Sequence, residues 1–385
     1  MKILIITDGY PNKNYQYVFL EQLVLSLLSL GHNITVVVPQ SVTKLIFRRV
    51  APFPRHETRR DDKGNDYELY SPRYLSFGSK FSFLRFIGYI SHRCSTYNIL
   101  KSKDLIFDII YAQFLKESSF TARYISHKTG IPFIVSLGEG SRFNFDKLGV
   151  ALKSTMIETI QNSSKLICLN GQIFDDFLSS NEHINQEKLT IIPNGVDSRL
   201  FYKVKKTNLR KKFNIHQDDF IVCFIGSFDH RKGILRLDEA LKILNLDIKV
   251  IYIGEGDLEP NYKSILFKGS LKHTEINNYL NLADVFVLPT TGEGSCNAIL
   301  EAMAVGLPII SSRDKFNDEI LSDDYSFRID SRSIHEISQA IMSLYLNPTL
   351  RQEMGDTAFK AASQFTLEKR THKISKIINE IGIER

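Results

Sequence analysis

The sequence predicts an α/β protein with two doubly wound parallel-sheet domains, and three observations support this fold class. The chain has 385 residues, 43% of them apolar and 24% charged, which is typical of a globular protein too long for a single core. Short apolar runs of strand type alternate with segments of helical apolar spacing. This alternation begins again after a polar, lysine-rich stretch at residues 191–213.

The first half of the chain opens with a strand, a helix and a second strand. KILIITD at residues 2–8 has the pattern of a buried strand, residues 17–30 have helical spacing, and NITVVVP follows Gly31 as the next strand. Further expected strands are DIIYAQF, PFIVSL and KLICLN, with helices near residues 117–128 and 147–163. This rhythm predicts a parallel sheet with helices on both faces.

The second half repeats the pattern. The stretch IIPNGVDSRLFYKVKKTNLRKKF, which contains Pro193 and Gly195, is interpreted as a domain linker. Five expected strands follow, each alternating with a helical segment: FIVCFIG, KVIYIG, ILFKG, DVFVLP and LPIIS. In such sheets ligands bind at the carboxyl ends of the strands, so the natural site is a cleft between two sheets.

Composition excludes several classes of protein. The 49 basic and 43 acidic residues leave a net charge of +6, which is too low a charge density for a protein built to bind nucleic acid. No apolar run is long enough to span a bilayer, and the N-terminus lacks signal-peptide features, so a cytoplasmic protein is expected. The four cysteines are far apart, without the spacing of a disulfide framework or a zinc site.

The positive charge is concentrated in residues 44–93. This segment holds eleven Lys or Arg residues and five acids, and their difference equals the net charge of the whole chain. Aromatic residues such as Phe77, Phe81, Phe83 and Phe86 are interleaved with the basic ones. The pattern suits peripheral contact with an anionic membrane surface, or with an anionic acceptor. The alternative interpretation is a solvated loop followed by an ordinary packed helix.

Two segments carry the expected chemistry. In FIVCFIGSFDHRKGI, a strand is followed by Gly226, a polar loop and Arg231-Lys232-Gly233 at the start of a helix. Helix-start amides and the Lys232 ammonium favour a phosphate, although lysine is also common at exposed turns.

The second segment, DVFVLPTTGEGSCNAILEAMAVGLPII, places Glu293 and Glu301 eight positions apart across a helix start. This arrangement allows a diphosphate on the amides and sugar hydroxyls on the carboxylates. The alternatives are a carboxylate that complements the helix dipole at Glu293 and an exposed helical glutamate at Glu301. The amides belong to Gly294, Ser295, Cys296 and Asn297.

These motifs, together with IIPNGVD and the N-terminal YPNKNYQYVFLEQLVLSLLSLGHNITVVVP, resemble the retaining glycosyltransferase family 4 of bacterial surface-polysaccharide type over nearly the full chain. The resemblance implies the GT-B fold, in which two Rossmann-like domains face a cleft. It implies an N-terminal acceptor-side domain of residues 1–197 plus about 366–385. Residues 198–365 would form the C-terminal domain that binds the nucleotide-sugar donor.

By the same resemblance, Glu301 would hold the ribose hydroxyls, Glu293 would lie near the donor sugar, and Lys232 would bind phosphate. Asn194 would lie at the interdomain crossing, and Gly9 remains from the glycines of the first strand-to-helix loop on the acceptor side. The donor site would further include Gly226, Ser227, Gly294, Ser295, Cys296 and Asn297.

The sequence departs from the family pattern at two positions. Ser227 stands where many members have a diphosphate-binding Arg, and Arg231 is expected to substitute for it. Gly138 stands where many members have an active-site His. The loop SLGEGSRF then makes Glu139 a candidate base and Arg142 an anion clamp on the acceptor side, or else it is a helix-capping turn.

The implied function is a hexosyltransferase-type reaction. A sugar would move from a UDP- or GDP-linked donor to a hydroxyl of a glycan or polyprenyl-lipid-linked acceptor, with retention and without a metal or cofactor. Two alternatives stay open, namely a non-catalytic nucleotide-sugar-binding partner subunit and a GT-B nucleotide-sugar epimerase. A dehydrogenase is disfavoured because no GxGxxG follows the first strand.

Overall fold

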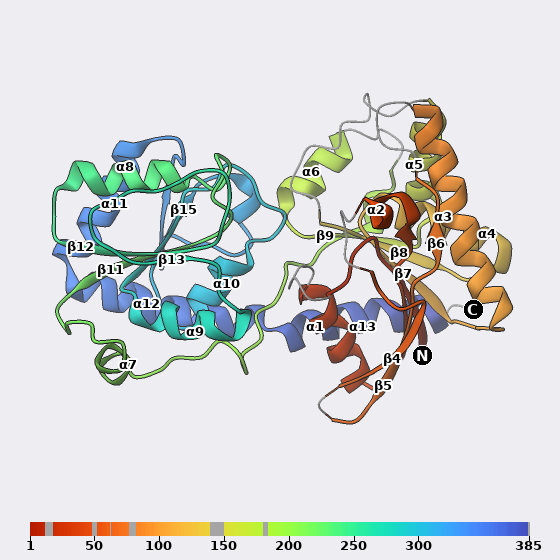
Figure 1. Ribbon diagram of the computed structural model, residues 1–385, viewed down its shortest axis with the longest axis horizontal. Helices are drawn as coiled ribbons and strands as arrows, with labels where there is room; N and C mark the ends of the chain where they lie inside the picture. The colour runs from red at the N-terminus through yellow and green to blue at the C-terminus, as the bar shows by residue number, and fades with distance from the viewer. Residues whose placement is uncertain are drawn as a thin grey trace. The chain divides into compact units, whose positions relative to one another are not determined.

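The computed structural model contains two compact units of chain (Figure 1). Unit 1 comprises Met1–Ile192 and Thr371–Arg385, and unit 2 comprises Pro193–Arg370. The residues that the structure describes are 1–11, 18–47, 52–61, 63–76, 82–138, 150–179 and 184–383.

Unit 1 is built on an eight-stranded sheet with the order β10-β9-β8-β7-β1-β2-β5-β4. Neighbouring strands are parallel, except that β4 and β5 pair antiparallel. The strands are β1 Lys2–Ile6, β2 Asn33–Val37, β4 His56–Arg60, β5 Asp66–Tyr70, β7 Ile109–Gln113, β8 Phe133–Leu137, β9 Lys165–Cys168 and β10 Leu189–Ile191. The helices are α1 Val18–Ser29, α2 Val42–Ile46, α3 Ser82–Ser102, α4 Glu117–Thr129, α5 Val150–Asn162, α6 Gly171–Ser179 and α13 Leu367–Ile383.

The sheet of unit 1 separates two apolar clusters. Leu4 and Ile6 of β1 point into one cluster, while Ile3 and Ile5 point into the other, as the two-residue period of a strand requires. The second cluster includes Ile374 and Ile378 from α13 as well as residues of α1. The expected doubly wound sheet with helices on both faces is therefore confirmed for this unit.

In the segment of residues 44–93, the structure corrects the expected solvated loop, confirms a helix after it, and does not test contact with an anionic surface. Its described part forms the antiparallel pair β4 and β5, the strand β6 (Arg73–Tyr74), which pairs with β3 (Gln40–Ser41) in a second two-stranded sheet, and the first part of α3. Arg60 pairs with Asp66 across the β4–β5 pair at 2.6 Å. Residues 56–70, which span this hairpin at the edge of the sheet, hold three of the segment's eleven basic residues and all five of its acids, so the positive excess lies outside the hairpin.

Unit 2 is built on a fully parallel sheet with the order β13-β12-β11-β14-β15-β16. Figure 1 shows α8 and α11 along one face and α9, α10 and α12 along the other. The strands are β11 Phe220–Ile225, β12 Ile248–Ile253, β13 Ile265–Gly269, β14 Val285–Leu288, β15 Ile309–Ser312 and β16 Ser326–Ile329. The helices are α7 Lys206–Lys212, α8 Ile234–Leu244, α9 His273–Leu282, α10 Asn297–Ala304, α11 Ile334–Leu346 and α12 Pro348–Ala362.

Unit 2 contains all five predicted strands, but three details of the prediction were wrong. Residues 254–264 contain no helix between β12 and β13, and β16 was not predicted. The lysine-rich stretch is not a free linker, because its residues Val196, Phe201 and Leu209 are buried in the core of unit 2. The apolar residues of that stretch, spaced among lysines, form part of the packed domain.

The described helices include none that is both long and apolar enough to cross a membrane. All four cysteines are free.

Candidate functional site

The strand order of unit 2 selects one place for a ligand. From β11 the chain proceeds outward through β12 to β13, and β14 then returns to the other side of β11 before continuing to β15 and β16. Ligands of doubly wound sheets bind at such a switch point, beyond the carboxyl ends of the strands. The loops after β11 and β14 are the two segments that the sequence motifs identified.

The loop between β11 and α8 carries Lys232 beside a glycine. A Cβ atom at Gly226 would lie 3.2 Å from Cδ of Lys232, so the absence of a side chain leaves room for the lysine stem. The Lys232 side chain is only 14% exposed. Gly233 caps α8 with φ of +77°, a conformation that glycine adopts at low cost, and a Cβ there would lie 2.5 Å from the carbonyl of Pro289. The RKG sequence therefore fits against the loop after β14.

The loop between β14 and α10 directs Glu293 at this lysine. Oε1 of Glu293 accepts from Nζ of Lys232 at 2.6 Å, from Nη1 of Arg231 at 3.0 Å and from the hydroxyl of Thr290 at 2.8 Å. The Glu293 side chain is 9% exposed, which strengthens these charge-assisted bonds relative to bulk water. Two predicted site residues, 61 positions apart along the chain, are thus in direct contact.

Ser227 and Asp229 organise the same loop. The Ser227 hydroxyl donates to Asp229 at 2.6 Å, and the other carboxylate oxygen of Asp229 accepts the backbone N–H of Lys232 at 2.7 Å. Burial raises the pKa of Asp229, but these bonds and the charges of Arg231 and Lys232 outweigh it, so its pKa lies below the ordinary value. Ser227 fixes the turn that presents Lys232, and Arg231, whose side chain is 47% exposed, is the accessible cation of the loop.

Glu301 lies on α10 and is bonded to a residue that the sequence analysis missed. Nε2 of His273, the first residue of α9, lies 3.0 Å from Oε1 of Glu301. Burial lowers the pKa of His273, but the hydrogen bond and charge of Glu301, with a contribution from Asp197, raise it above its ordinary value. Oε2 of Glu301 accepts no hydrogen bond from the described residues.

Asn194 is anchored to the start of α10. Its backbone N–H donates to the Ser295 hydroxyl at 3.1 Å, and its side-chain amide donates to Asn297 at 2.9 Å. A Cβ at Gly195 would lie 2.6 Å from the carbonyl of Thr366, so a side chain does not fit there. The Asn-Gly pair therefore holds the turn before α10 in place.

Cys296 and Gly294 complete the loop. Cys296 is the N-cap residue of α10 and is buried, and this burial raises the pKa of its thiol to about 12. The thiol remains protonated at neutral pH and does not act as a nucleophile. Gly294 lies in the bend before it.

Unit 1 has its own switch point between β1 and β7, and its loops hold a cluster that the sequence did not reveal. Asp8 follows β1, directly before the predicted Gly9, and lies 3.4 Å from the Ser118 hydroxyl, which donates to the carbonyl of Gln113 at 2.6 Å. Nε2 of His92, on α3, lies 3.6 Å from the Asp8 carboxylate, and Nδ1 lies 2.7 Å from the Thr121 hydroxyl. The His92 side chain is 1% exposed and that of Asp8 is 28% exposed. Only Asp8 is accessible to a substrate.

The glycine at position 138 has a steric explanation, because its surroundings leave no room for a side chain. A Cβ at this position would lie 2.8 Å from the ring of Phe114 and 3.2 Å from Leu169, so a histidine in this backbone position would require the Phe114 ring to move. The two acceptor-side candidates that follow it, Glu139 and Arg142, lie outside the described residues.

The described residues contain no group of three or more His, Cys, Asp or Glu side chains suited to a metal ion. At the switch point of unit 2 the charges are instead those of Arg231 and Lys232 against Asp229 and Glu293. An anionic ligand would compete with Glu293 for the same two cations. The site can therefore neutralise charge on a ligand through fixed cations of the chain itself.

Residues 205–361 match the family described as Glycosyl transferases group 1. The matched segment lies within unit 2. It contains the loop of Lys232 and the loop of Glu293, while Asn194 precedes it.

Relatives with glycosyltransferase names extend the similarity beyond unit 2. A Bacillus subtilis protein, TuaC, whose name assigns it provisionally to teichuronic acid biosynthesis as a glycosyltransferase, is 24% identical over 96% of this chain and 96% of its own length. The Escherichia coli UDP-Gal:alpha-D-GlcNAc-diphosphoundecaprenol alpha-1,3-galactosyltransferase is 27% identical over 76% of this chain and 79% of its own. The expected enzyme class, a glycosyltransferase, is confirmed at this level.

Solved structures confirm the fold. Sucrose-phosphate synthase from Thermosynechococcus elongatus superposes with a TM-score of 0.79 at 14% identity, covering 100% of both chains. Anabaena Alr3699/HepE in complex with UDP gives 0.75 at 15% identity, covering 99% of this chain and 100% of the other. The expected GT-B fold of two Rossmann-like domains is confirmed.

Proposed function

We propose that this protein is a retaining, metal-independent hexosyltransferase of family 4. It would move a sugar from a UDP- or GDP-linked donor to a hydroxyl of a glycan or lipid-linked acceptor. The observation that carries the proposal is the pair Arg231 and Lys232 held at the switch point of unit 2, with Glu301 one helix turn beyond the start of α10. Support comes from the UDP complex of HepE and from the lipid-linked substrate in the name of the Escherichia coli relative.

In this proposal the diphosphate of the donor occupies the space beside Lys232. The backbone amide of Ser295 lies before the start of α10, where the helix dipole favours an anion, whereas that of Asn297 already donates to the Ser295 carbonyl at 3.1 Å. Oε2 of Glu301, which accepts no hydrogen bond from the described residues, is the acceptor for the ribose hydroxyls.

The reaction follows from the charges at the site. As the bond between the sugar carbon C1 and the diphosphate breaks, negative charge develops on the leaving oxygen, and Lys232 and Arg231, for which the diphosphate competes with Glu293, stabilise it. The acceptor hydroxyl forms its bond to C1 on the face that the diphosphate leaves, and its proton passes to the departing oxygen. Configuration is retained without a protein nucleophile. No cofactor is needed, because the nucleotide-sugar is already activated.

On the acceptor side we propose the switch point of unit 1. Asp8 is partly exposed, and the buried His92 lies 3.6 Å from its carboxylate. A carboxylate in this setting can orient a sugar hydroxyl. Glu139 and Arg142 remain the candidates for base and anion clamp proposed from the sequence.

The test is sugar transfer by the purified full chain. Labelled UDP- and GDP-sugars are incubated with membrane extract, and the variant Glu301→Ala is compared with Glu239→Ala, which removes an exposed glutamate of α8. We expect transfer by the wild type and by Glu239→Ala, and loss of most transfer in Glu301→Ala. No transfer by the wild type would favour a non-catalytic subunit, and donor turnover without acceptor would favour an epimerase.

We also propose peripheral membrane contact through the segment of residues 44–93. Ile46 and Phe47 at the end of α2 are 69% and 71% exposed, and Phe83 at the start of α3 is 69% exposed. Lys44 on α2 adds a charge that anionic headgroups attract. Bulky apolar side chains that remain exposed beside lysine are typical of residues that insert at the headgroup level.

Vesicle cosedimentation tests this contact. We expect binding that requires anionic lipid, weakens with salt and is reduced by the double change Ile46→Ser and Phe47→Ser. The control is Ile243→Ser, which removes an exposed isoleucine from α8 of unit 2. Binding that ignores salt, or that falls equally in the control, would contradict the proposal.

A further inference from the structure

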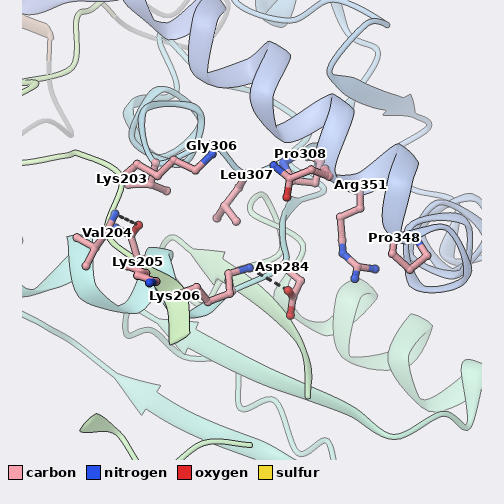
Figure 2. A pocket seen from close by; sticks show the side chains of 14 residues that line it. Lys203, Val204, Lys205, Lys206, Asp284, Gly306, Leu307, Pro308, Pro348 and Arg351 are labelled. Atoms are coloured by element: carbon pink, nitrogen blue, oxygen red, sulfur yellow. Dashed lines mark hydrogen bonds and ion pairs between the residues drawn. The ribbon is translucent and has the colours of Figure 1, made fainter. Parts of the chain in front are cut away.

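A pocket of about 660 Å³ lies in unit 2 at the end of the sheet opposite the candidate donor site (Figure 2). Asp284, which lines the pocket, directly precedes β14, whereas the loop of Glu293 follows the same strand. Four strand residues separate the two ends, a distance of about 10 Å along the sheet. The pocket is therefore distinct from the place proposed for the donor.

The lining of the pocket is rich in cations. Four of the described lining residues are basic, and Asp284 is the one carboxylate among them. The basic residues come from the segment before α7, from the first residue of α7 and from the first turn of α12, and Figure 2 shows them around the pocket. They are Lys203, Lys205, Lys206 and Arg351.

The carboxylate does not neutralise these cations. Oδ1 of Asp284 accepts from Lys206 at 2.9 Å, but Oδ2 already accepts from the buried Arg210 at 2.7 Å and from the backbone N–H of Ile221 at 2.8 Å. One negative charge thus faces two positive ones. The pKa of Lys206 lies below its ordinary value. Burial lowers this pKa most, the positive charges of Arg210 and Arg351 lower it further, and Asp284 raises it only in part.

Arg351 and Lys205 carry the remaining positive charge. Nη1 of Arg351 donates to the carbonyl of Leu344 at 2.6 Å, and the guanidinium lies over the ring of Phe220 at 5.1 Å. Neither Arg351 nor the exposed Lys205 has a carboxylate partner among the described residues. Lys203 is different, because it pairs with Asp356 at 2.9 Å.

The pocket also has apolar walls. Carbon surface is contributed from the turn between α10 and β15 and from the start of α12. In Figure 2, Leu307 lies between the lysine segment and Arg351. A bare inorganic ion would leave this surface in contact with water, whereas an organic group attached to the anion would cover it. The apolar residues are Val204, Ala283, Val305, Leu307, Pro308 and Pro348.

We propose that this pocket is a second binding site, separate from the donor site, that takes an organic phosphate monoester. The phosphate is placed between Lys206, Lys205 and Arg351, and its carbon framework lies on Leu307 and Pro308. A phosphate monoester carries between one and two negative charges at neutral pH, and it offers three acceptor oxygens to these donors. The phosphate can belong to a soluble metabolite or to a lipid headgroup, since both present the same chemistry.

Calorimetric titration of the full chain with glycerol 3-phosphate tests the site. We expect saturable binding that weakens with salt and exceeds the affinity for inorganic phosphate. Arg351→Gln and Lys205→Glu should each weaken binding at least about tenfold, as expected for the loss of a charge-assisted hydrogen bond. Lys205 is exposed, so its variant folds even if the change at Arg351 disturbs packing.

Two controls separate this site from the others. Lys263→Gln removes an exposed lysine that does not line the pocket and should leave the affinity unchanged. Lys232→Met removes the donor-site lysine and should also leave it unchanged. Cosedimentation with vesicles of phosphatidic acid, against vesicles of phosphatidylcholine alone, identifies the source. If Arg351→Gln and Lys205→Glu weaken binding only to phosphatidic acid vesicles, the ligand is a lipid headgroup. If they weaken binding only to glycerol 3-phosphate, the ligand is soluble.

The proposal is overturned if neither probe binds, or if binding is equal in wild type, Arg351→Gln and Lys205→Glu. It is also overturned if Lys232→Met abolishes binding, because the phosphate would then occupy the donor site. The proposed transferase function is unaffected by either result, since its own test uses sugar transfer.

Discussion

Replacing Lys232 by methionine tests the anion site most directly. Methionine keeps an unbranched stem of similar length beside Gly226, so the change removes the charge and leaves the packing nearly intact. The lysine bonds to Glu293 at 2.6 Å, and the two side chains are 14% and 9% exposed, so solvent screens their charges little. The fold should be retained, because Glu293 still accepts from Arg231 and Thr290.

The magnitude follows from the bond that a bound diphosphate would lose. A hydrogen bond to a charged group contributes about 1.5–3 kcal/mol, which corresponds to a loss of about 10- to 150-fold in affinity for a nucleoside diphosphate. Transfer should fall further, by about 100- to 1000-fold, because charge on the leaving oxygen grows in the transition state. Lys232 then contributes more to the rate than to binding.

Calorimetry with UDP and GDP gives the affinity, and release of nucleoside diphosphate in the presence of acceptor gives the rate. Lys263→Met serves as the control, since it removes an exposed lysine elsewhere in unit 2. Wild-type affinity and turnover in Lys232→Met, with the control also unchanged, would refute the assignment of the anion site.

Two further predictions concern stability. Arg210→Met leaves Asp284 buried without its main partner, so urea denaturation should show a loss of about 3–5 kcal/mol, and an unchanged midpoint would contradict this. Glu301→Gln should destabilise the protein more at low pH than at high pH. Because Glu301 raises the pKa of His273, the pair stabilises the fold fully below the ordinary histidine pKa and loses this contribution as pH rises through the raised value. Urea midpoints of wild type and variant at several pH values measure this, and a difference independent of pH would count against the pair.

The sequence predicted the strands that are continuous apolar runs. KILII and FIVCFI, now β1 and β11, are buried on both faces of their sheets, and this environment selects such runs. HETRR, now β4, has no apolar residue, and DYELY, now β5, alternates acidic with apolar residues. Both belong to an edge hairpin, and they were interpreted as part of a charged segment. A helix was expected between β12 and β13 because strands and helices alternate in the rest of unit 2, but this connection contains none.

The candidate site was predictable only where spacing along the chain decides the position. Lys232 and Glu293 each follow a strand, and adjacent parallel strands bring such loops together. The contact between His273 and Glu301 depends on how α9 packs beside α10, and no local pattern encodes it. The same holds for His92 and Asp8, which come from α3 and from the loop after β1, 84 positions apart.

The way the chain divides into two units determines which unit can be completed first during synthesis on the ribosome. Unit 2 is one continuous segment, whereas unit 1 needs Ile374 and Ile378 of α13 to fill the space against its second apolar cluster. The N-terminal part of the chain emerges first, yet its domain is completed only after the other domain has been made. Truncation before residue 371 would therefore harm the domain that begins the chain, and unit 2 is the one that can be produced as a single uninterrupted fragment.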